Sequence, residues 1–221
     1  MKIKAIITGS TGMVGEGVMH ECLLSPEVES VLVINRRPCN VQHPKLKEVI
    51  HANFYDFTAI KDELTGYNAC FHCMGVTSIG KKEEEYNKLT YDITMALANL
   101  LSRLNPGMTV CYVSGEGTDS TEKGKIMWAR VKGKTENNLI KLFSPKAFMF
   151  RPALIVPTPG LKNTYKMYKV LSPLIPVFKF IMPKHVCSLK EIGLAMINTV
   201  NYGYEKQLLD VPDIIRLAHN S

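Results

Sequence analysis

The sequence contains no long apolar segment and no histidine or cysteine spacing that is typical of a metal site. No stretch of about 18 or more apolar residues is free of charges, so no membrane-spanning helix is expected. The apolar run at the N-terminus stops at Gly9, which is too short for a secretory signal and predicts a buried strand instead. Basic residues do not interleave with aromatic residues in a stripe, so nucleic-acid binding is not expected.

Cysteines are few and scattered, with six among 221 residues. Without a secretory signal they are predicted to be reduced thiols in a cytoplasmic protein. Cys70 and Cys73 form a CxxC, but they lie in the apolar run NACFHC, which favours core packing over redox or metal chemistry. The net charge of +7 is modest and is compatible with an anionic cofactor.

Short β-rich apolar runs alternate with segments of helical periodicity along most of the chain. Strands are predicted at 4–8, 30–35, 47–53, 68–73, 108–114 and 147–154. Helices are predicted at 14–24, 57–64, 86–104 and 125–143. This alternation predicts an α/β protein with a doubly wound, Rossmann-type parallel sheet that helices cover on both faces.

The alternation changes after Arg151, and the chain is divided into two regions at Val156. Residues 1–156 are expected to form a nucleotide-binding core. Residues 157–221 are expected to supply a small C-terminal cap or lid and the elements that complete the same domain. The basic, apolar segment 162–182 is interpreted as a substrate lid or a dimer surface, and peripheral membrane contact is the less favoured alternative.

A glycine-rich turn is the strongest functional signal in the chain. Gly9, Gly12 and Gly15 have the spacing GxxGxxG between a buried strand and a helix. Residues without a β-carbon let a pyrophosphate approach the backbone, and the start of the helix offers free N–H groups to it. The turn predicts nucleotide binding, whereas a turn that serves packing alone is the alternative. The predicted binding residues are Thr8, Gly9, Thr11, Gly12, Met13, Val14 and Gly15.

The end of the second predicted strand indicates which dinucleotide is bound. A site that prefers NAD(H) places a carboxylate here for the adenosine ribose, but this chain has Asn35, Arg36 and Arg37. Two guanidinium groups suit a 2′-phosphate, which favours NADP(H) over NAD(H). The alternative is a solvated basic strand end, which leaves the preference open.

Two further strand ends contribute candidate cofactor residues. Asp56 and Phe57 follow the third strand, where Asp56 is expected either to cap a helix or to meet the adenine amino group. Cys73, Met74 and Gly75 end the fourth strand, and Gly75 lets the chain pass close to the cofactor. These positions share the carboxyl edge of the sheet with the glycine turn.

Six short motifs together resemble the atypical and extended short-chain dehydrogenase/reductases, a nicotinamide-binding superfamily that includes NAD-dependent epimerases and dehydratases. The motifs are TGSTGMVG, NRRP, CMGVT, YVSGEG, WARVKGKTE and RPALIV. Their order is most similar to that of the Tat-interacting 30-kDa family of oxidoreductase-like proteins. The resemblance runs from Lys2 to about Val156, and the last third of the chain carries no motif that matches.

The resemblance implies roles for residues at matching positions. Ser114 would orient the substrate oxygen, Lys132 would bind the nicotinamide ribose, and the backbone at Ala153 and Ile155 would meet the carboxamide. The proton-donating tyrosine of typical members is replaced by Trp128. Because an indole N–H does not titrate at any useful pH, Trp128 is not a general acid or base.

Other groups are candidates to supply the missing proton. They are Lys132 itself and Tyr86, Tyr91, Tyr112, Glu116, Tyr165 and Tyr168. We therefore expect an NADP(H)-dependent oxidoreductase that acts on an unidentified small carbonyl or alcohol, with a homodimer as an expectation from the same resemblance. A catalytically weak or inactive NADPH-binding sensor is the main alternative, and an epimerase or dehydratase is a third.

Overall fold

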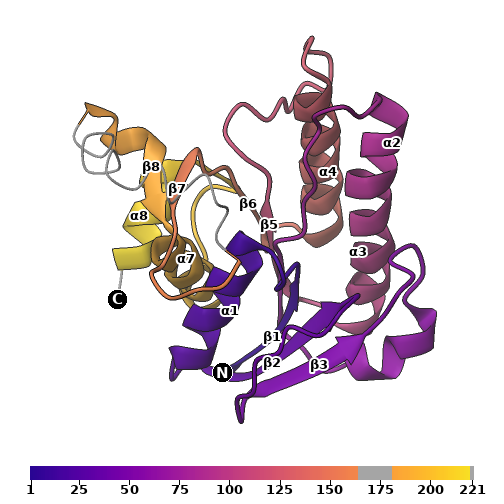
Figure 1. Cartoon of the computed structure of the whole chain (residues 1–221), viewed down its shortest axis with the longest axis vertical. Helices are drawn as coiled ribbons and strands as arrows, with labels where there is room; N and C mark the ends of the chain where they lie inside the picture. Colours follow the sequence, from indigo (N-terminus) through magenta and orange to yellow (C-terminus); the bar gives the residue numbers. More distant parts are fainter. Residues whose placement is uncertain (164–180, 220–221) are drawn as a thin grey trace.

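The computed structural model describes residues 1–163 and 181–219 (Figure 1). Within these residues a seven-stranded sheet has the order β3-β2-β1-β4-β5-β6-β9, and neighbouring strands are parallel. From β1 the order continues to β2 and β3 on one side and to β4, β5 and β6 on the other. This confirms the predicted doubly wound fold. The strands are β1 (Ile3–Thr8), β2 (Val28–Asn35), β3 (Leu46–Ile50), β4 (Ala69–His72), β5 (Thr109–Val113), β6 (Ala147–Phe150) and β9 (Leu208–Leu209).

Helices cover both faces of the sheet (Figure 1). On one face lie α1 (Met13–Leu24), α7 (Leu189–Tyr202) and α8 (Val211–His219). On the other face lie α3 (Ile93–Leu104) and α4 (Met127–Phe143). The shorter helical elements are η1 (Thr58–Leu64), α2 (Glu83–Asn87), the π-helical turn η2 (Lys88–Asp92) and η4 (Pro183–His185). No helix in the described part of the chain is long and apolar enough to cross a membrane.

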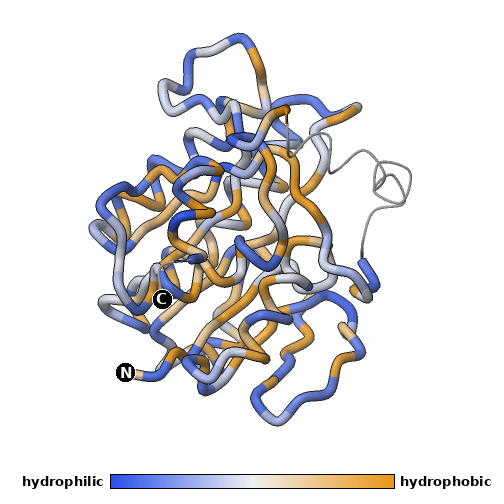
Figure 2. The backbone as a smooth tube through the Cα atoms, turned by 90° about the vertical axis from the view of Figure 1, so that its left-hand side faces the viewer, coloured by the Kyte–Doolittle hydropathy of each residue, from blue (hydrophilic) through white to orange (hydrophobic). Residues whose placement is uncertain are grey.

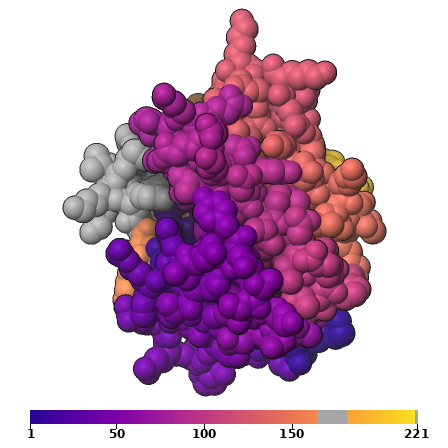
Figure 3. Space-filling view, turned by 90° about the vertical axis from the view of Figure 1, so that its right-hand side faces the viewer, coloured from indigo at the N-terminus to yellow at the C-terminus, as the bar shows by residue number. Residues whose placement is uncertain are grey.

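The two faces of the sheet bury separate apolar cores. Successive strand residues point to opposite faces, so Ile7 of β1 packs with α1 and α7, whereas Ile6 packs with α3 and α4. Figure 2 shows the apolar stretches of the backbone running mainly through the interior. Viewed from the side of α2 and α3, the surface is closed by side chains (Figure 3).

Elements from the C-terminal third pack into this same layered structure. Strand β9 lies beside β6 at the edge of the sheet, and α7 packs against α1. A β-carbon at Gly17 of α1 would lie 3.0 Å from Leu189, and one at Gly193 of α7 would lie 2.7 Å from the side chain of Glu21. Glycine at these two positions lets the two helices approach closely.

The structure differs from the predicted elements in a few places. The strand predicted at 147–154 is two strands, because it breaks after Phe150 and resumes as β7 (Leu154–Val156). Strand β7 pairs in parallel with β8 (Val186–Ser188), which was not predicted. The helix predicted at 57–64 is the 3₁₀-helix η1. Most of segment 162–182, including Tyr165 and Tyr168, lies outside the described residues.

Candidate cofactor site

The glycine turn between β1 and α1 has no room for a β-carbon at Gly9 or Gly15. Gly9 has φ +77°, and a β-carbon there would lie 2.7 Å from the backbone nitrogen of Met74. A β-carbon at Gly15 would lie 2.1 Å from the carbonyl oxygen of Gly9. The Gly12 N–H donates to that same oxygen at 2.9 Å. The turn therefore holds α1 tightly against the strand ends, as a pyrophosphate cradle requires.

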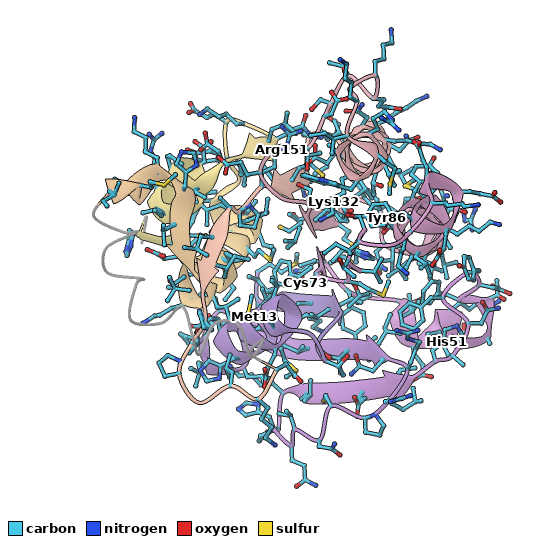
Figure 4. All side chains as sticks on the ribbon, turned by 45° about the horizontal axis from the view of Figure 1, so that its top comes forward. Met13, His51, Cys73, Tyr86, Lys132 and Arg151 are labelled. Atoms are coloured by element: carbon cyan, nitrogen blue, oxygen red, sulfur yellow. The ribbon has the colours of Figure 1, made fainter. Side chains whose placement is uncertain are left out.

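A cleft of about 580 Å³ opens at the carboxyl edge of the sheet, above this turn. Most of the predicted cofactor and catalytic residues line it, and they come from segments far apart in the sequence. These residues are Gly9, Thr11, Gly12, Met13, Val14, Asn35, Arg36, Cys73, Met74, Gly75, Ser114, Lys132, Ala153 and Ile155. Figure 4 shows Met13, Cys73 and Lys132 following one another from α1 past the end of β4 to α4, with His51 well away from them.

Three of the predicted residues lie beside the cleft rather than in its wall. Thr8 is fully buried, and its hydroxyl is 3.1 Å from Nδ1 of His72. Gly15 supports the turn from below through its contact with Gly9. Arg37 lines a second, adjoining cleft of about 790 Å³, which shares Thr11 and Arg36 with the first.

The structure does not place Asp56 and Phe57 in the cleft. The Asp56 carboxylate accepts hydrogen bonds from the backbone N–H and the hydroxyl of Thr58, at 2.9 and 2.7 Å. The predicted helix cap is not seen, because η1 has Phe57 at its N-cap and no side-chain cap hydrogen bond. Asp56 instead closes a turn just before η1. Phe57 is buried in the core and packs edge-on against Phe54. Since Phe54 lines the cleft, the aromatic group at this end of the cleft lies three residues earlier than predicted.

Other lining residues were missed because they are apolar or small and sit next to predicted ones. They are Ile34, Phe54, Val76, Thr77, Val113, Gly115 and Pro152. Phe54 also lines an apolar side pocket of about 450 Å³ together with Tyr55, Leu89 and Ile93. The signal that could have found Phe54 is its position directly after the strand predicted at 47–53, at the edge where the other strand ends meet.

Asn35 is held in place by two polar partners. Its side-chain oxygen accepts from the Ser10 hydroxyl at 2.9 Å, and its amide donates to Glu48 at 2.7 Å. The Glu48 carboxylate also accepts from the Cys39 N–H at 2.9 Å. Burial opposes ionisation of Glu48, but these hydrogen bonds outweigh it and lower the pKa of the carboxyl. The end of β2 is therefore a fixed point from which Arg36 and Arg37 extend into solvent.

Lys132 on α4 is a cation in the cleft wall whose pKa is lowered. Its Nζ donates to the carbonyl oxygen of Ser114 at the end of β5. Burial lowers the pKa of Lys132 to about 8, and the charge of Glu136 offsets part of that effect. The Ser114 hydroxyl donates to the carbonyl oxygen of Phe150 at 3.1 Å. Both residues line the cleft, and the hydrogen bond from Lys132 joins α4 to the end of β5.

Trp128 does not line the cleft, although it is one helical turn before Lys132. The edge of its ring packs against Gly117, where a β-carbon would lie 3.5 Å from Cη2 of the indole. Residues four apart lie on the same face of a helix, but the indole of Trp128 does not reach the cleft wall. In this structure Trp128 packs against the loop that follows β5.

That loop is anchored on α4 at Gly133, next to Lys132. A β-carbon at Gly133 would lie 1.8 Å from the carbonyl oxygen of Asp119, so the VKGK sequence lets the loop rest directly on the helix. Deeper in the same region Arg151 forms a two-point ion pair with Glu136, whose side chain is fully buried. These contacts fix α4, and with it Lys132, relative to β5 and β6.

The candidate proton donors differ in their access to the cleft. Tyr86 and Tyr112 are buried, and burial raises the pKa of both phenols. The ring of Tyr91 lies under the ammonium of Lys134, 3.9 Å from ring centroid to Nζ. The carboxylate of Glu116 is 2.7 Å from Nδ1 of His185, and both side chains are exposed to solvent. Of the described candidates, Lys132 is the one in the cleft wall.

Comparison with known proteins places this arrangement in a family. Protein FMP52 of Meyerozyma guilliermondii is 24% identical over 70% of this chain and 66% of its own length, and its counterpart in Debaryomyces hansenii is 26% identical over 70% and 67%. The chain thus aligns with about two thirds of the length of these relatives. Both are named as mitochondrial proteins, which contradicts the prediction of a cytoplasmic protein drawn from cysteine usage.

Solved structures share the fold at low sequence identity. Glucuronic acid dehydrogenase from Chromohalobacter salexigens superposes with a TM-score of 0.66 and 13% identity, over 95% of this chain and 76% of that protein. The WbmF enzyme of Bordetella bronchiseptica in complex with NAD+ gives 0.66 and 15%, over 98% and 76%. The narrower likeness to the Tat-interacting 30-kDa proteins stays a prediction. The sequence model of the NAD dependent epimerase/dehydratase family matches residues 5–119, more than half of the chain, and the protein therefore belongs to this nicotinamide-binding oxidoreductase and epimerase family.

Proposed function

We propose that the protein is an NADP(H)-dependent oxidoreductase that interconverts a small carbonyl compound and its alcohol. The observation that carries the proposal is one cleft whose wall combines the glycine turn, Arg36 and Lys132. The glycine cradle has room for a pyrophosphate only because β-carbons are absent at its close contacts. A family match supports nicotinamide as the cofactor, whereas the preference for the phosphorylated form rests on the two arginines.

Each part of the cleft has a defined task in this proposal. The turn and the N-terminus of α1 bind the pyrophosphate, and Arg36 with Arg37 bind the 2′-phosphate. Lys132 binds the nicotinamide ribose, and Ser114 orients the substrate oxygen. The bound nicotinamide supplies or accepts the hydride. Apolar lining residues such as Met74, Val113 and Ile155 exclude water from the region around Lys132.

Lys132 is the proposed source of the proton that the missing tyrosine would have supplied. With a pKa near 8 its Nζ is largely protonated at neutral pH, yet close enough to titration to release a proton. Transfer from Nζ to a developing alkoxide leaves a neutral amine, which solvent then reprotonates. General acid catalysis of this kind contributes roughly 10²- to 10⁴-fold to a rate.

A second candidate is a cofactor-binding protein without turnover, which senses NADPH or regulates a partner. The position of Trp128 favours it, because the residue that replaces the catalytic tyrosine packs against Gly117 outside the cleft wall. Such a protein needs the glycine turn and the arginines, but it does not need a proton donor.

Turnover measurements separate the two candidates. Oxidation of NADPH is followed with a panel of small aldehydes and ketones, using the unmodified protein, Lys132→Ala and Trp128→Tyr. An enzyme is expected to show activity that falls at least about 100-fold in Lys132→Ala. Absence of turnover in the unmodified protein, with NADPH still bound, supports the sensor. Activity that appears only in Trp128→Tyr shows that the rest of the site can turn over substrate but lacks a proton donor.

A further inference from the structure

The second cleft contains a basic group that no sequence motif indicated. Its wall includes Arg36 and Arg37 at the end of β2 and also Lys162, which lies more than a hundred positions later in the chain. The cleft adjoins the cofactor cleft through Thr11 and Arg36. Three cationic side chains thus surround a space that is continuous with the start of α1.

Lys162 is brought to this space by a carboxylate on α1. Glu16 is buried, with a relative exposure of 7% for the whole residue, and lies in the first turn of α1 directly after the glycine turn. Its two oxygens accept the backbone N–H groups of Lys162 and Asn163 at 2.9 and 2.7 Å. A carboxylate that accepts two backbone donors makes strong, charge-assisted hydrogen bonds. Glu16 therefore clamps this segment against the phosphate-binding turn.

The charges of the second cleft are not balanced within the described part of the chain. Arg36, Arg37 and Lys162 are exposed, and none of them has an ion-pair partner among the residues that the structure describes. The Glu16 carboxylate is used on backbone N–H groups, and the Glu48 carboxylate on Asn35 and Cys39. Unpaired cations around one concave surface attract an anion.

We propose that Lys162 is a specificity-determining residue that grips the 2′-phosphate of NADP(H) together with Arg36 and Arg37, and that Glu16 is its positioning residue. The inference rests on the proposed NADP(H) binding. A 2′-phosphate carries close to two negative charges at neutral pH, and a compact ammonium adds a point charge to the forked contacts of the arginines.

The test compares two cofactors that differ only in the 2′-phosphate. Dissociation constants for NADPH and NADH are measured by titration calorimetry on the unmodified protein and on Lys162→Ala, Lys162→Arg, Glu16→Gln and Arg36→Ala. Loss of one charged contact to phosphate is expected to weaken NADPH binding about 5- to 10-fold in Lys162→Ala. NADH binding should change less than about 2-fold, and Lys162→Arg should keep most of the preference. Glu16→Gln retains one acceptor and should lose part of the preference.

Three outcomes are decisive. The ratio compared is the dissociation constant of NADH divided by that of NADPH. If Lys162→Ala leaves this ratio unchanged while Arg36→Ala lowers it, the inference is overturned and the proposed cofactor preference stands. If Lys162→Ala weakens both cofactors equally, its role is structural and the inference is again overturned. If the unmodified protein binds NADPH no more tightly than NADH, the proposed cofactor preference fails, and the role of Lys162 fails with it.

Discussion

Replacing Lys132 with methionine is expected to change how the stability of the protein depends on pH. Burial lowers the pKa of Lys132 from its ordinary value of 10.5 to about 8 in the folded protein. Between these two values the unfolded chain carries a proton on Lys132 that the folded protein lacks. The free energy of unfolding therefore gains a contribution that rises with pH across this window.

The size of this contribution follows from the difference in pKa. Each pKa unit corresponds to about 1.4 kcal/mol, so the full contribution is about 3 kcal/mol when the pH exceeds the ordinary value. Below pH 8 Lys132 is protonated in both states, so the contribution is absent there. The cost of holding a buried ammonium is thus present at neutral pH and is removed as the pH rises.

The assay is urea denaturation of the unmodified protein and Lys132→Met at a series of pH values from 7 to 10. The difference between their unfolding free energies is plotted against pH, because the shared cysteines and tyrosines cancel in that difference. From about pH 7 to about pH 10, the unfolding free energy of the unmodified protein should rise by about 2 kcal/mol relative to that of the variant. A difference that stays constant over this range would show that burial does not lower the pKa of Lys132. It would also remove the basis for Lys132 as the proposed proton donor.

Two pairs of substitutions, each a test with its control, probe the architecture of the site. Gly15→Ala places a β-carbon 2.1 Å from a carbonyl oxygen of the turn and should lower the unfolding free energy by about 3 kcal/mol, whereas Gly12→Ala meets only a 3.4 Å contact and should weaken cofactor binding with little loss of stability. Equal stability losses would contradict this division. Arg151→Met leaves the buried Glu136 carboxylate unpaired and should cost about 3–5 kcal/mol by chemical denaturation. Arg130→Met, which breaks an exposed ion pair, is the control and should cost at most about 1 kcal/mol.

Much of the fold was predictable because the sheet is parallel and buried on both faces. Its strands are continuous apolar runs, such as residues 30–35, and the intervening helices have clear apolar spacing. The glycine turn was predictable for a different reason, since positions such as Gly15 admit no β-carbon whatever side chains surround them. These features depend on local sequence, which a single chain displays directly.

The remaining features depend on contacts between distant segments. Strand β8 has three residues and forms only by pairing with β7, so its local sequence carries little signal. Nothing near Lys162 indicates that Glu16 will accept its backbone N–H. Trp128 lies one helical turn before Lys132, but its indole packs against the loop at Gly117 instead of the cleft wall. Helical spacing determines on which face of a helix a side chain lies, but contacts with neighbouring residues determine where the end of that side chain packs.

The central claim is that the carboxyl-edge cleft binds a nicotinamide dinucleotide and prefers the phosphorylated form. The most direct measurement is the thermal stability of the unmodified protein with saturating NADPH, compared with NADH. At about 100 times its dissociation constant, a bound ligand adds roughly 2.7 kcal/mol to the stability of the folded state. We predict a clear stabilisation with NADPH and a smaller one with NADH at the same concentration. No stabilisation by either nucleotide would contradict the claim.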